Sequence, residues 1–258
     1  MMTSRTLACG IAYLCMLLPA LAGAACLRDE PGSLWNYEGT LGGKFRVRMS
    51  LVFAGPRVEG VYFYSSQLKD IRLRGRIEGG TRIVLDELDA AGAVTARFEA
   101  TFPTRDPGTR YGDSPLECEV IAGTWRRLDG ANPLAVYLAA ENSTSGSLGQ
   151  RYAILGVQDD EVVHRGAQDF WRAVKAGDRR AVAARVAYPI TVQVGGKRRR
   201  LGGPGALLEV YDAVFTPAFR RSIEAAMPRN MFVRDQGVML GSGQAWFDAR
   251  GRVVALNN

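Results

Sequence analysis

The sequence predicts an all-β N-terminal domain, a seven- or eight-stranded antiparallel meander or small barrel, followed by an α+β C-terminal domain. Three observations predict this division. Apolar and polar residues alternate with a period of two through residues 35–140, between turns rich in Gly, Pro and Asp. A Ser/Gly-rich polar stretch follows at residues 141–149, and from residue 161 onward the apolar residues recur at helical spacing. We therefore expect a domain at residues 25–140, a linker at 141–158 and a second domain at 159–258.

Residues 1–24 have the pattern of a secretory signal peptide. Arg5 precedes an apolar run at residues 11–21, and Ala22-Gly-Ala24 is a small-residue cleavage site. The apolar run is too short for a transmembrane span, which needs about 20 residues. We expect cleavage near Ala24, a periplasmic or secreted location and no transmembrane span in the mature protein. Lipidation at Cys26 is the alternative, although Gly23 stands where a lipoprotein signal carries a branched aliphatic residue.

Cleavage there would leave two of the four cysteines, Cys26 and Cys118. An even pair in an exported chain predicts one disulfide, here between the mature N-terminus and a distant segment of the first domain. A metal site is not expected, because His164 is the only histidine available as a ligand.

The strands of the first domain are clearest at residues 44–53, where Phe45, Val47 and Met49 alternate with Arg46 and Arg48. Similar alternation follows in the segments 58–64, 71–77, 83–85, 96–102, 116–125 and 134–138. One apolar and one charged face favour a meander curled into a small barrel. The arginines at 72, 74 and 76 are interpreted as a solvated outer face, with an anion-binding face as the alternative.

Three segments of this domain carry a family resemblance: Val58-Glu-Gly-Val-Tyr-Phe-Tyr64, Ile71-Arg-Leu-Arg-Gly75 and Ile121-Ala-Gly-Thr-Trp125. They are similar to the G-x-Y-x-Y, L-x-G and G-x-W strands of β-meander domains in exported bacterial proteins of unknown function. The resemblance covers about residues 35–140. It implies a fold and says nothing of an activity.

Charge is distributed unevenly along the chain. Residues 25–150 hold 15 Lys and Arg against 16 Asp and Glu, whereas residues 151–258 hold 17 against 10. The basic second half favours an anionic partner, either an envelope component or an acidic protein surface. Nucleic acid is not expected for an exported chain without basic motifs interleaved with aromatic residues.

The second domain is predicted to open with an amphipathic helix at residues 161–176, followed by a second helix that Asp178 caps. A strand pair at 190–194 and 197–201, helices beginning near Gly205 and at Thr216-Pro217, and a strand at 231–233 come next. Residues 237–256 are expected to form two long strands joined at Asp248–Gly251. Gly241 and Gly243 would mark a bend in the first of them.

This order of elements resembles the NTF2-like superfamily, and within it a branch of exported proteins of unknown function. The matched features are Gly177-Asp178, Tyr188-Pro189-Ile190, Tyr211-Asp212, Gln236–Gly241 and Trp246-Phe247. The resemblance implies a cone, in which a bent sheet is closed by helices around a pocket. Its enzymes place acidic or His side chains inside that cone, and this chain offers few of them.

Candidate site residues follow from these patterns. His164 and Asp212 are the candidate acid or base groups, against the alternatives of a half-buried helix residue and a solvated carboxylate. Tyr188, Tyr211, Gln244 and Trp246 are candidates to line a pocket, or else pack in the core. Lys197, Arg198, Arg199 and Arg200 form a basic arm that either contacts an anionic partner or is a solvated hairpin.

The sequence therefore favours an exported, non-catalytic binding or inhibitory module that recognises an envelope component or another protein. No cofactor is expected, because G-x-S-x-G, Walker-type, H-E-x-x-H and C-x-x-C motifs are all missing from the sequence. The alternative is a small-molecule enzyme of the NTF2-like kind, an isomerase or dehydratase, that uses an acid or base in the cone.

Overall fold

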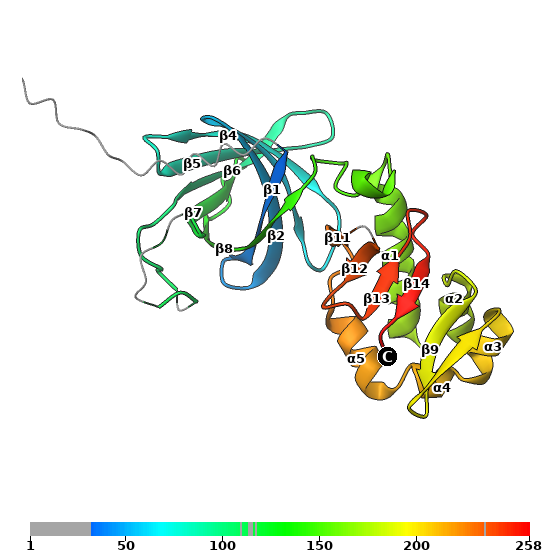
Figure 1. The fold of residues 1–258 in the computed structure, drawn as a ribbon. Coiled ribbons are helices and arrows are strands. Elements are labelled where there is room, and N and C mark those ends of the chain that lie inside the picture. The colour runs from blue at the N-terminus through cyan, green and yellow to red at the C-terminus, as the bar shows by residue number, and fades with distance from the viewer. Residues whose placement is uncertain (1–31, 109, 113–115, 117, 235) are drawn as a thin grey trace, which may run out of the picture.

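The computed structural model describes residues 32–108, 110–112, 116, 118–234 and 236–258. The predicted signal peptide and Cys26 lie outside the described residues, so the cleavage site and the Cys26–Cys118 disulfide stay predictions. Figure 1 shows a barrel beside a smaller body of helices and short strands.

The N-terminal part is a closed antiparallel barrel of eight strands in sequence order, which confirms the predicted meander. The barrel closes because the first strand pairs with both the second and the last. Its strands are β1 (Ser33–Leu41), β2 (Phe45–Ala54), β3 (Arg57–Tyr64), β4 (Ile71–Glu78), β5 (Arg82–Leu88), β6 (Val94–Thr101), β7 (Val120–Arg127) and β8 (Leu134–Ser145).

Alternation along each strand sends apolar side chains into the barrel, where they form one buried cluster that includes Tyr37, Leu51, Tyr62 and Phe98. The outer face carries ion pairs, such as Arg46 and Arg48 with Glu38. Glycine is required for steric reasons at two positions of the strand motifs. A Cβ at Gly75 would overlap a carbonyl oxygen of β5, and one at Gly123 would overlap a carbonyl oxygen of β6.

Strand β8 is longer than expected. It runs to Ser145, so its last five residues, 141–145, lie in the segment predicted as a linker. Ser143, Thr144 and Ser145 pair with the start of β1, and a register shift near Asn36 accommodates the extra length. Pairing with β1, which closes the barrel, outweighs the low β-propensity of Glu141 and Asn142 in this segment.

The C-terminal part contains helices and two antiparallel sheets. After the short 3₁₀ turn Ala153–Leu155, the helices are α1 (Asp160–Ala176), α2 (Arg179–Ala184), α3 (Pro204–Glu209), α4 (Tyr211–Val214) and α5 (Pro217–Ala225). The two-stranded sheet is β9 (Ile190–Val194) with β10 (Lys197–Leu201), and the four-stranded sheet is β11 (Phe232–Arg234), β12 (Gly237–Leu240), β13 (Ala245–Phe247) and β14 (Val253–Leu256).

The prediction of one long strand across residues 237–247 was wrong. The chain reverses at residues 241–244, and β12 pairs antiparallel with β13. Gly241 and Gly243 have φ values of +59° and +104°, which glycine adopts without the steric cost of a side chain. Two glycines two residues apart therefore mark a tight turn here, because φ values of +59° and +104° lie far from the value of about −140° of a regular antiparallel strand.

Helix α1 packs along this sheet and is the longest helix of the described residues. Its buried face contributes Val163, Phe170 and Val174 to a core that also holds Phe215 and Phe247. No helix within the described ranges is long and apolar enough to cross a membrane.

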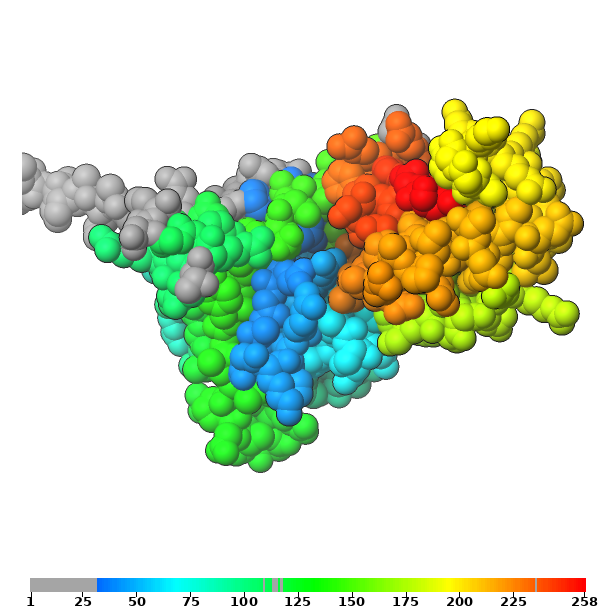
Figure 2. Space-filling model, turned by 90° about the horizontal axis from the view of Figure 1, so that it is seen from below, coloured from blue at the N-terminus to red at the C-terminus, as the bar shows by residue number. Residues whose placement is uncertain are grey.

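The two parts are in contact. In the space-filling view of Figure 2, blue and cyan atoms of the barrel abut orange atoms of the C-terminal part. Hydrogen bonds link Gln168 to the carbonyl oxygen of Leu68 and Arg229 to Asp70, both partners lying in the loop between β3 and β4.

Candidate functional site

A cleft of about 640 Å³ lies between the barrel and the C-terminal part. Strands β1, β2 and β8 form one wall, which is mostly polar. Helix α5, the segment after it and the β12–β13 turn form the other. The polar wall includes Asn36, Arg48, Ser50, Glu141, Asn142, Thr144 and Arg151. The opposite wall is mixed: its apolar residues are Ala225, Ala226, Met227, Met231, Phe232 and Met239, and its polar residues are Ser222, Asn230, Arg234, Ser242 and Gln244.

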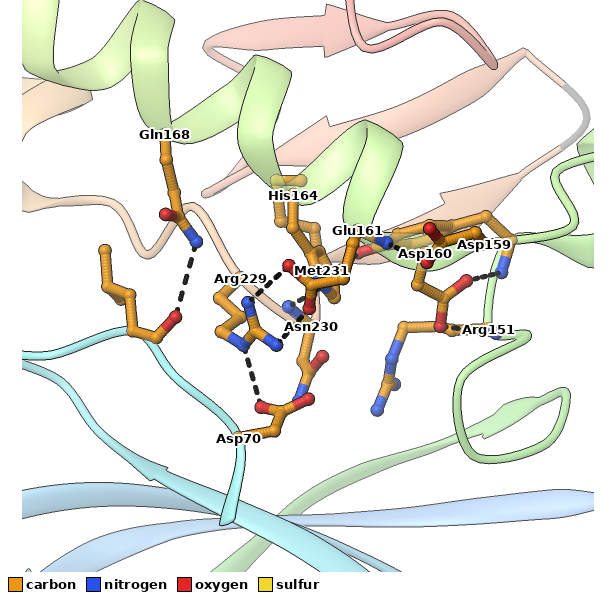
Figure 3. A network of polar contacts seen from close by, with 12 residues as sticks. Asp70, Arg151, Asp159, Asp160, Glu161, His164, Gln168, Arg229, Asn230 and Met231 are labelled. Atoms are coloured by element: carbon orange, nitrogen blue, oxygen red, sulfur yellow. Dashed lines mark hydrogen bonds and ion pairs between the residues drawn. The ribbon is translucent and has the colours of Figure 1, made fainter. Parts of the chain in front are cut away.

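Arg151 crosses from one part to the other. Its backbone N–H donates to Asp160 Oδ2 at 2.8 Å, in the first turn of α1. The neighbouring Tyr152 N–H donates to the other oxygen of Asp160 at 3.2 Å. Figure 3 shows the Arg151 side chain pointing from this helix end toward the barrel strands. The carboxylate of Asp160 thus fixes where the guanidinium enters the cleft wall.

The buried guanidinium of Arg151 has only neutral hydrogen-bond partners among the described residues. Arg151 is 4% exposed. Its Nη1 donates to Asn36 Oδ1 at 3.1 Å and to Thr144 Oγ1 at 3.3 Å, and its Nη2 donates to Ser50 Oγ at 2.8 Å. In the part of the chain that the structure describes, no carboxylate lies within ion-pair distance of it.

This arrangement leaves a positive charge in a poorly solvated place. Burial lowers the pKa of Arg151, because the charged form loses hydration that neutral hydroxyl and amide groups only partly replace. Arginine nevertheless stays protonated in proteins. The charges of Asp160 and Asp70 favour the protonated form from a distance, and an anion that enters the cleft would supply a direct counterion.

A second polar cluster lies beside the cleft, around the first turns of α1. His164 is buried, at 1% exposed, which corrects the expectation of a half-buried residue. Its Nε2 lies 3.1 Å from Tyr152 Oη and 3.3 Å from the Asn230 backbone N–H donor. Its Nδ1 lies 3.3 Å from Glu161 Oε1.

These contacts assign the hydrogen positions. The backbone N–H of Met231 donates to Tyr152 Oη at 2.9 Å, so the tyrosine O–H is free to donate to His164 Nε2. Nε2 also accepts from Asn230, which places the ring proton on Nδ1, where it donates to Glu161. Every polar atom of this ring is therefore engaged.

Arg229 extends the cluster to the barrel, as Figure 3 shows. Its guanidinium pairs with Glu161 of α1 and, through Nε at 2.7 Å, with Asp70 of the barrel. The hydrogen bond from His164 and the Arg229 guanidinium together lower the pKa of Glu161 to about 2. Burial opposes the charged form of Arg229, but the pairs with Asp70 and Glu161 outweigh it and raise the pKa of this arginine.

The Tyr152–His164–Glu161 arrangement has the order of a catalytic hydrogen-bonded relay, but Tyr152 and His164 are buried, and the cavity beside His164 and Glu161 measures about 60 Å³, far below the roughly 300 Å³ or more of a typical ligand pocket. Tyr152 is 0% exposed and burial raises the pKa of its hydroxyl, which opposes its use as a base or nucleophile. The cluster joins α1, the segment 229–231 and the barrel loop. Its geometry is that of a structural junction.

Comparisons of this chain with family models, with curated proteins and with solved structures return no match.

Of the residues predicted to line a pocket, Gln244 borders the cleft. Tyr211 is packed in the C-terminal core, 4.6 Å from the Phe215 ring. The Tyr188 hydroxyl donates to the Ala183 carbonyl oxygen at 3.0 Å, and Trp246 lies on β13. These three residues do not border the cleft, so the predicted four do not form one site.

Asp212 and the basic arm are also placed away from the cleft. The Asp212 side chain is 75% exposed and paired with Arg179 at 2.8 Å, so the burial that an acid or base role would require is not present. Lys197, Arg198, Arg199 and Arg200 are exposed along β10, with Arg199 3.8 Å from Glu209. The arm therefore stays a candidate surface for an anionic partner. No group of three or more potential metal ligands occurs among the described residues.

Sequence reasoning missed Arg151, Ser50 and Asn36, which make the polar wall. One signal was present: in the alternating segment 44–53, Ser50 follows Arg46 and Arg48 on the outward face, and a small residue there indicates a covered position. The structure buries Ser50 to 3% exposure, under Arg151. Arg151 itself gave no signal, since nothing local in a sequence distinguishes a buried arginine from a solvated one.

Proposed function

We propose that this protein is an exported, non-catalytic binding module that takes an anionic group of an envelope component or another protein into the cleft. The observation that carries the proposal is Arg151, a buried cation at the cleft wall whose described partners are all neutral. Asn36, Thr144 and Ser50 engage three of its five N–H donors, and the two that have no partner among the described residues, on Nε and Nη2, suit carboxylate and phosphate oxygens.

The opposite wall favours a ligand with an apolar portion. Met227, Met231, Phe232 and Met239 face the polar wall across the cleft. Methionine side chains are flexible and adapt to apolar ligands of different shapes. The ligand that matches both walls is an amphiphilic anion, with its charged group on Arg151 and its apolar part against the methionines.

Export rests on the signal-peptide pattern at residues 1–24, and the NTF2-like relationship rests on the motifs of the second half. We keep both as part of the proposal. A binding role is favoured over an enzyme because His164 is buried beside a cavity of only about 60 Å³ and Asp212 is a surface carboxylate paired with an arginine.

Titration calorimetry with octanoate tests the proposal. Octanoate should bind the mature protein, whereas acetate, which lacks the apolar chain, and octanol, which lacks the charge, should bind much more weakly. Arg151→Met should weaken octanoate binding by about 10- to 100-fold, the value of a charge-assisted hydrogen bond. Arg151→Lys, which keeps the charge and loses the fork, should give an intermediate affinity.

The matched control replaces Lys197, Arg198, Arg199 and Arg200 with glutamine, which removes the basic arm and leaves the cleft intact. This variant should bind octanoate as the unmodified protein does. Loss of binding in the arm variant with retention in Arg151→Met would move the site to the arm. Equal binding of octanol and octanoate would contradict an anion site altogether.

A further inference from the structure

One open end of the barrel holds a second cavity, of about 620 Å³, that is distinct from the cleft. It is lined by the ends of β3 to β7 and by the loops that join them. Below it the barrel is filled by packed side chains. The cavity is therefore a cup at the barrel mouth with a solid floor. Its lining includes Tyr62, Tyr64, Lys69, Asp70, Ile71, Arg72, Glu87, Asp89, Thr95, Trp125 and Arg127.

Glu87 occupies an inward-facing position of β5. The alternation that buries Ile83 and Leu85 continues to residue 87, and its strand neighbours Leu73 and Ala96 are buried core residues. A glutamate therefore stands at the top of the barrel interior, where the same strand carries aliphatic side chains below. An inward-facing carboxylate costs desolvation energy, so the hydrogen bonds of Glu87 show what offsets that cost.

Three neutral donors hold this carboxylate. Tyr62 Oη donates to Oε2 at 2.5 Å and Trp125 Nε1 donates to the same oxygen at 3.1 Å. Thr95 Oγ1 donates to Oε1 at 2.9 Å. An ionised carboxylate offers about four acceptor positions, so one position remains on Oε1. Among the described residues, no Lys or Arg lies within ion-pair distance of Glu87.

Aromatic rings surround the carboxylate. Tyr62 and Tyr64 lie edge to face, with 5.6 Å between ring centroids, and Trp125 reaches Glu87 from β7. The faces of such rings attract cations. The arginines of the rim have other partners: Arg127 pairs with Asp129 at 2.7 Å, and Arg72 donates to the carbonyl oxygens of Asp89 and Ala90. They are not the counterions of Glu87.

We propose that the barrel mouth is a binding site for an organic ammonium group, which would pair with Glu87 and lie against the rings of Tyr64 and Trp125. A carboxylate fixed by neutral donors, in a cavity that Tyr64 and Trp125 also line, matches a positively charged nitrogen in both charge and surface. The site is independent of the cleft, because it uses a charge of the opposite sign on a different set of residues.

Choline is the probe that tests this site. Its neutral counterpart is neopentyl carbinol (3,3-dimethylbutan-1-ol), in which carbon replaces the charged nitrogen. Choline should bind the mature protein and shift the indole N–H signal of Trp125 in a proton–nitrogen correlation spectrum, since that N–H donates to Glu87. The chain has four tryptophans, and the signal lost in Trp125→Phe assigns the one concerned. The neutral alcohol should not shift it.

Glu87→Gln removes the charge and keeps an oxygen that can accept from Tyr62, so the barrel should still fold. Its affinity for choline should fall by about tenfold or more. The matched control is Glu78→Gln. Glu78 is the last residue of β4, whose first residues line the cavity, and it pairs on the surface with Arg76 and Arg82. This control should bind choline normally. Octanoate binding should be unchanged in both variants, which separates this site from the cleft.

Three outcomes would overturn the proposal. They are equal binding of choline and neopentyl carbinol, choline binding that is unchanged in Glu87→Gln, and a Trp125 indole signal that does not respond to choline. If Glu87→Gln did not fold, Thr95→Val would provide the test, because it removes only the donor to Oε1 and should alter the affinity for choline.

Discussion

At the scale of single residues, this molecule is defined by charged groups that are held without a direct counterion among the described residues. Arg151 and Glu87 are each fixed by neutral donors or acceptors, one in the cleft and one at the barrel mouth. By contrast, Glu161 and Asp70 share the charge of Arg229, and that ion-paired cluster ties the parts together. Neutral partners thus distinguish the two candidate sites from the structural ion pairs.

Glu161 gives a prediction about pH. Its pKa of about 2 in the folded protein lies below the value of about 4.3 for an unperturbed glutamate. A lowered pKa contributes stability above pH 4.3, and that contribution is lost as the pH falls toward 2. Glu161→Gln should therefore be less stable than the unmodified protein at pH 7, and the difference should shrink between pH 4.5 and pH 2.

Urea unfolding of both proteins across this pH range measures the difference. Glu209→Gln is the control, because Glu209 is exposed and lies 3.8 Å from Arg199. It should change stability little at any pH. A stability difference between Glu161→Gln and the unmodified protein that stays constant down to pH 2 would contradict the assigned role of Glu161.

Residue environments were the least predictable level. His164 was correctly placed on helix α1 by periodicity, but its burial depends on Tyr152 and Asn230, which come from distant segments. Tyr211 lies on α4 and Trp246 on β13, and neither residue borders the cleft. Sequence pattern assigns a residue to a face of its own element, and the contacts of that face are decided by tertiary packing.

At the scale of elements, prediction succeeded where periodicity was long and failed where short segments competed. The barrel strands and α1 follow the apolar pattern closely, with α1 at Asp160–Ala176 against the predicted 161–176. The helix expected around residues 205–215 is divided into α3 and α4 at Val210. The β12–β13 turn was missed because two glycines fit a bent strand and a turn equally well at the level of sequence.

Gly166 provides a prediction at this scale, because two effects oppose one another there. In the middle of α1, replacement of glycine by alanine normally stabilises a helix by about 1 kcal/mol. In this structure a Cβ at Gly166 would overlap the carbonyl oxygen of Gly251, in the turn between β13 and β14. The steric overlap should outweigh the gain in helix propensity, so Gly166→Ala should destabilise the protein by about 1–3 kcal/mol.

Thermal or urea unfolding checks the sign. Gly202→Ala is the matched control, since a Cβ added at Gly202 would have no neighbour within 4 Å and the residue has no positive φ. That substitution should be neutral or slightly stabilising. Stabilisation by Gly166→Ala would show that α1 does not contact the β13–β14 turn as closely as described.

At the scale of the whole molecule, the cleft lies where the barrel and the C-terminal part are held together by several polar contacts. Arg229 with Asp70 and Gln168 with Leu68 join the parts outside the cleft, and Arg151 with Ser50 and Asn36 joins them in its wall. The barrel supplies the polar wall, and the C-terminal part supplies the mixed wall that carries the methionines. The division into two parts could be predicted from the change in periodicity, whereas the cleft between them could not, because it depends on how two independent surfaces dock.

The central claim is that Arg151 receives an anion in this cleft, and a crystal structure of the mature protein grown with octanoate tests it most directly. We predict carboxylate oxygens within hydrogen-bond distance of the Arg151 guanidinium, with the alkyl chain between Met227 and Met231. Octanoate bound on Lys197–Arg200, or an unoccupied cleft in a protein that binds octanoate in solution, would contradict the claim.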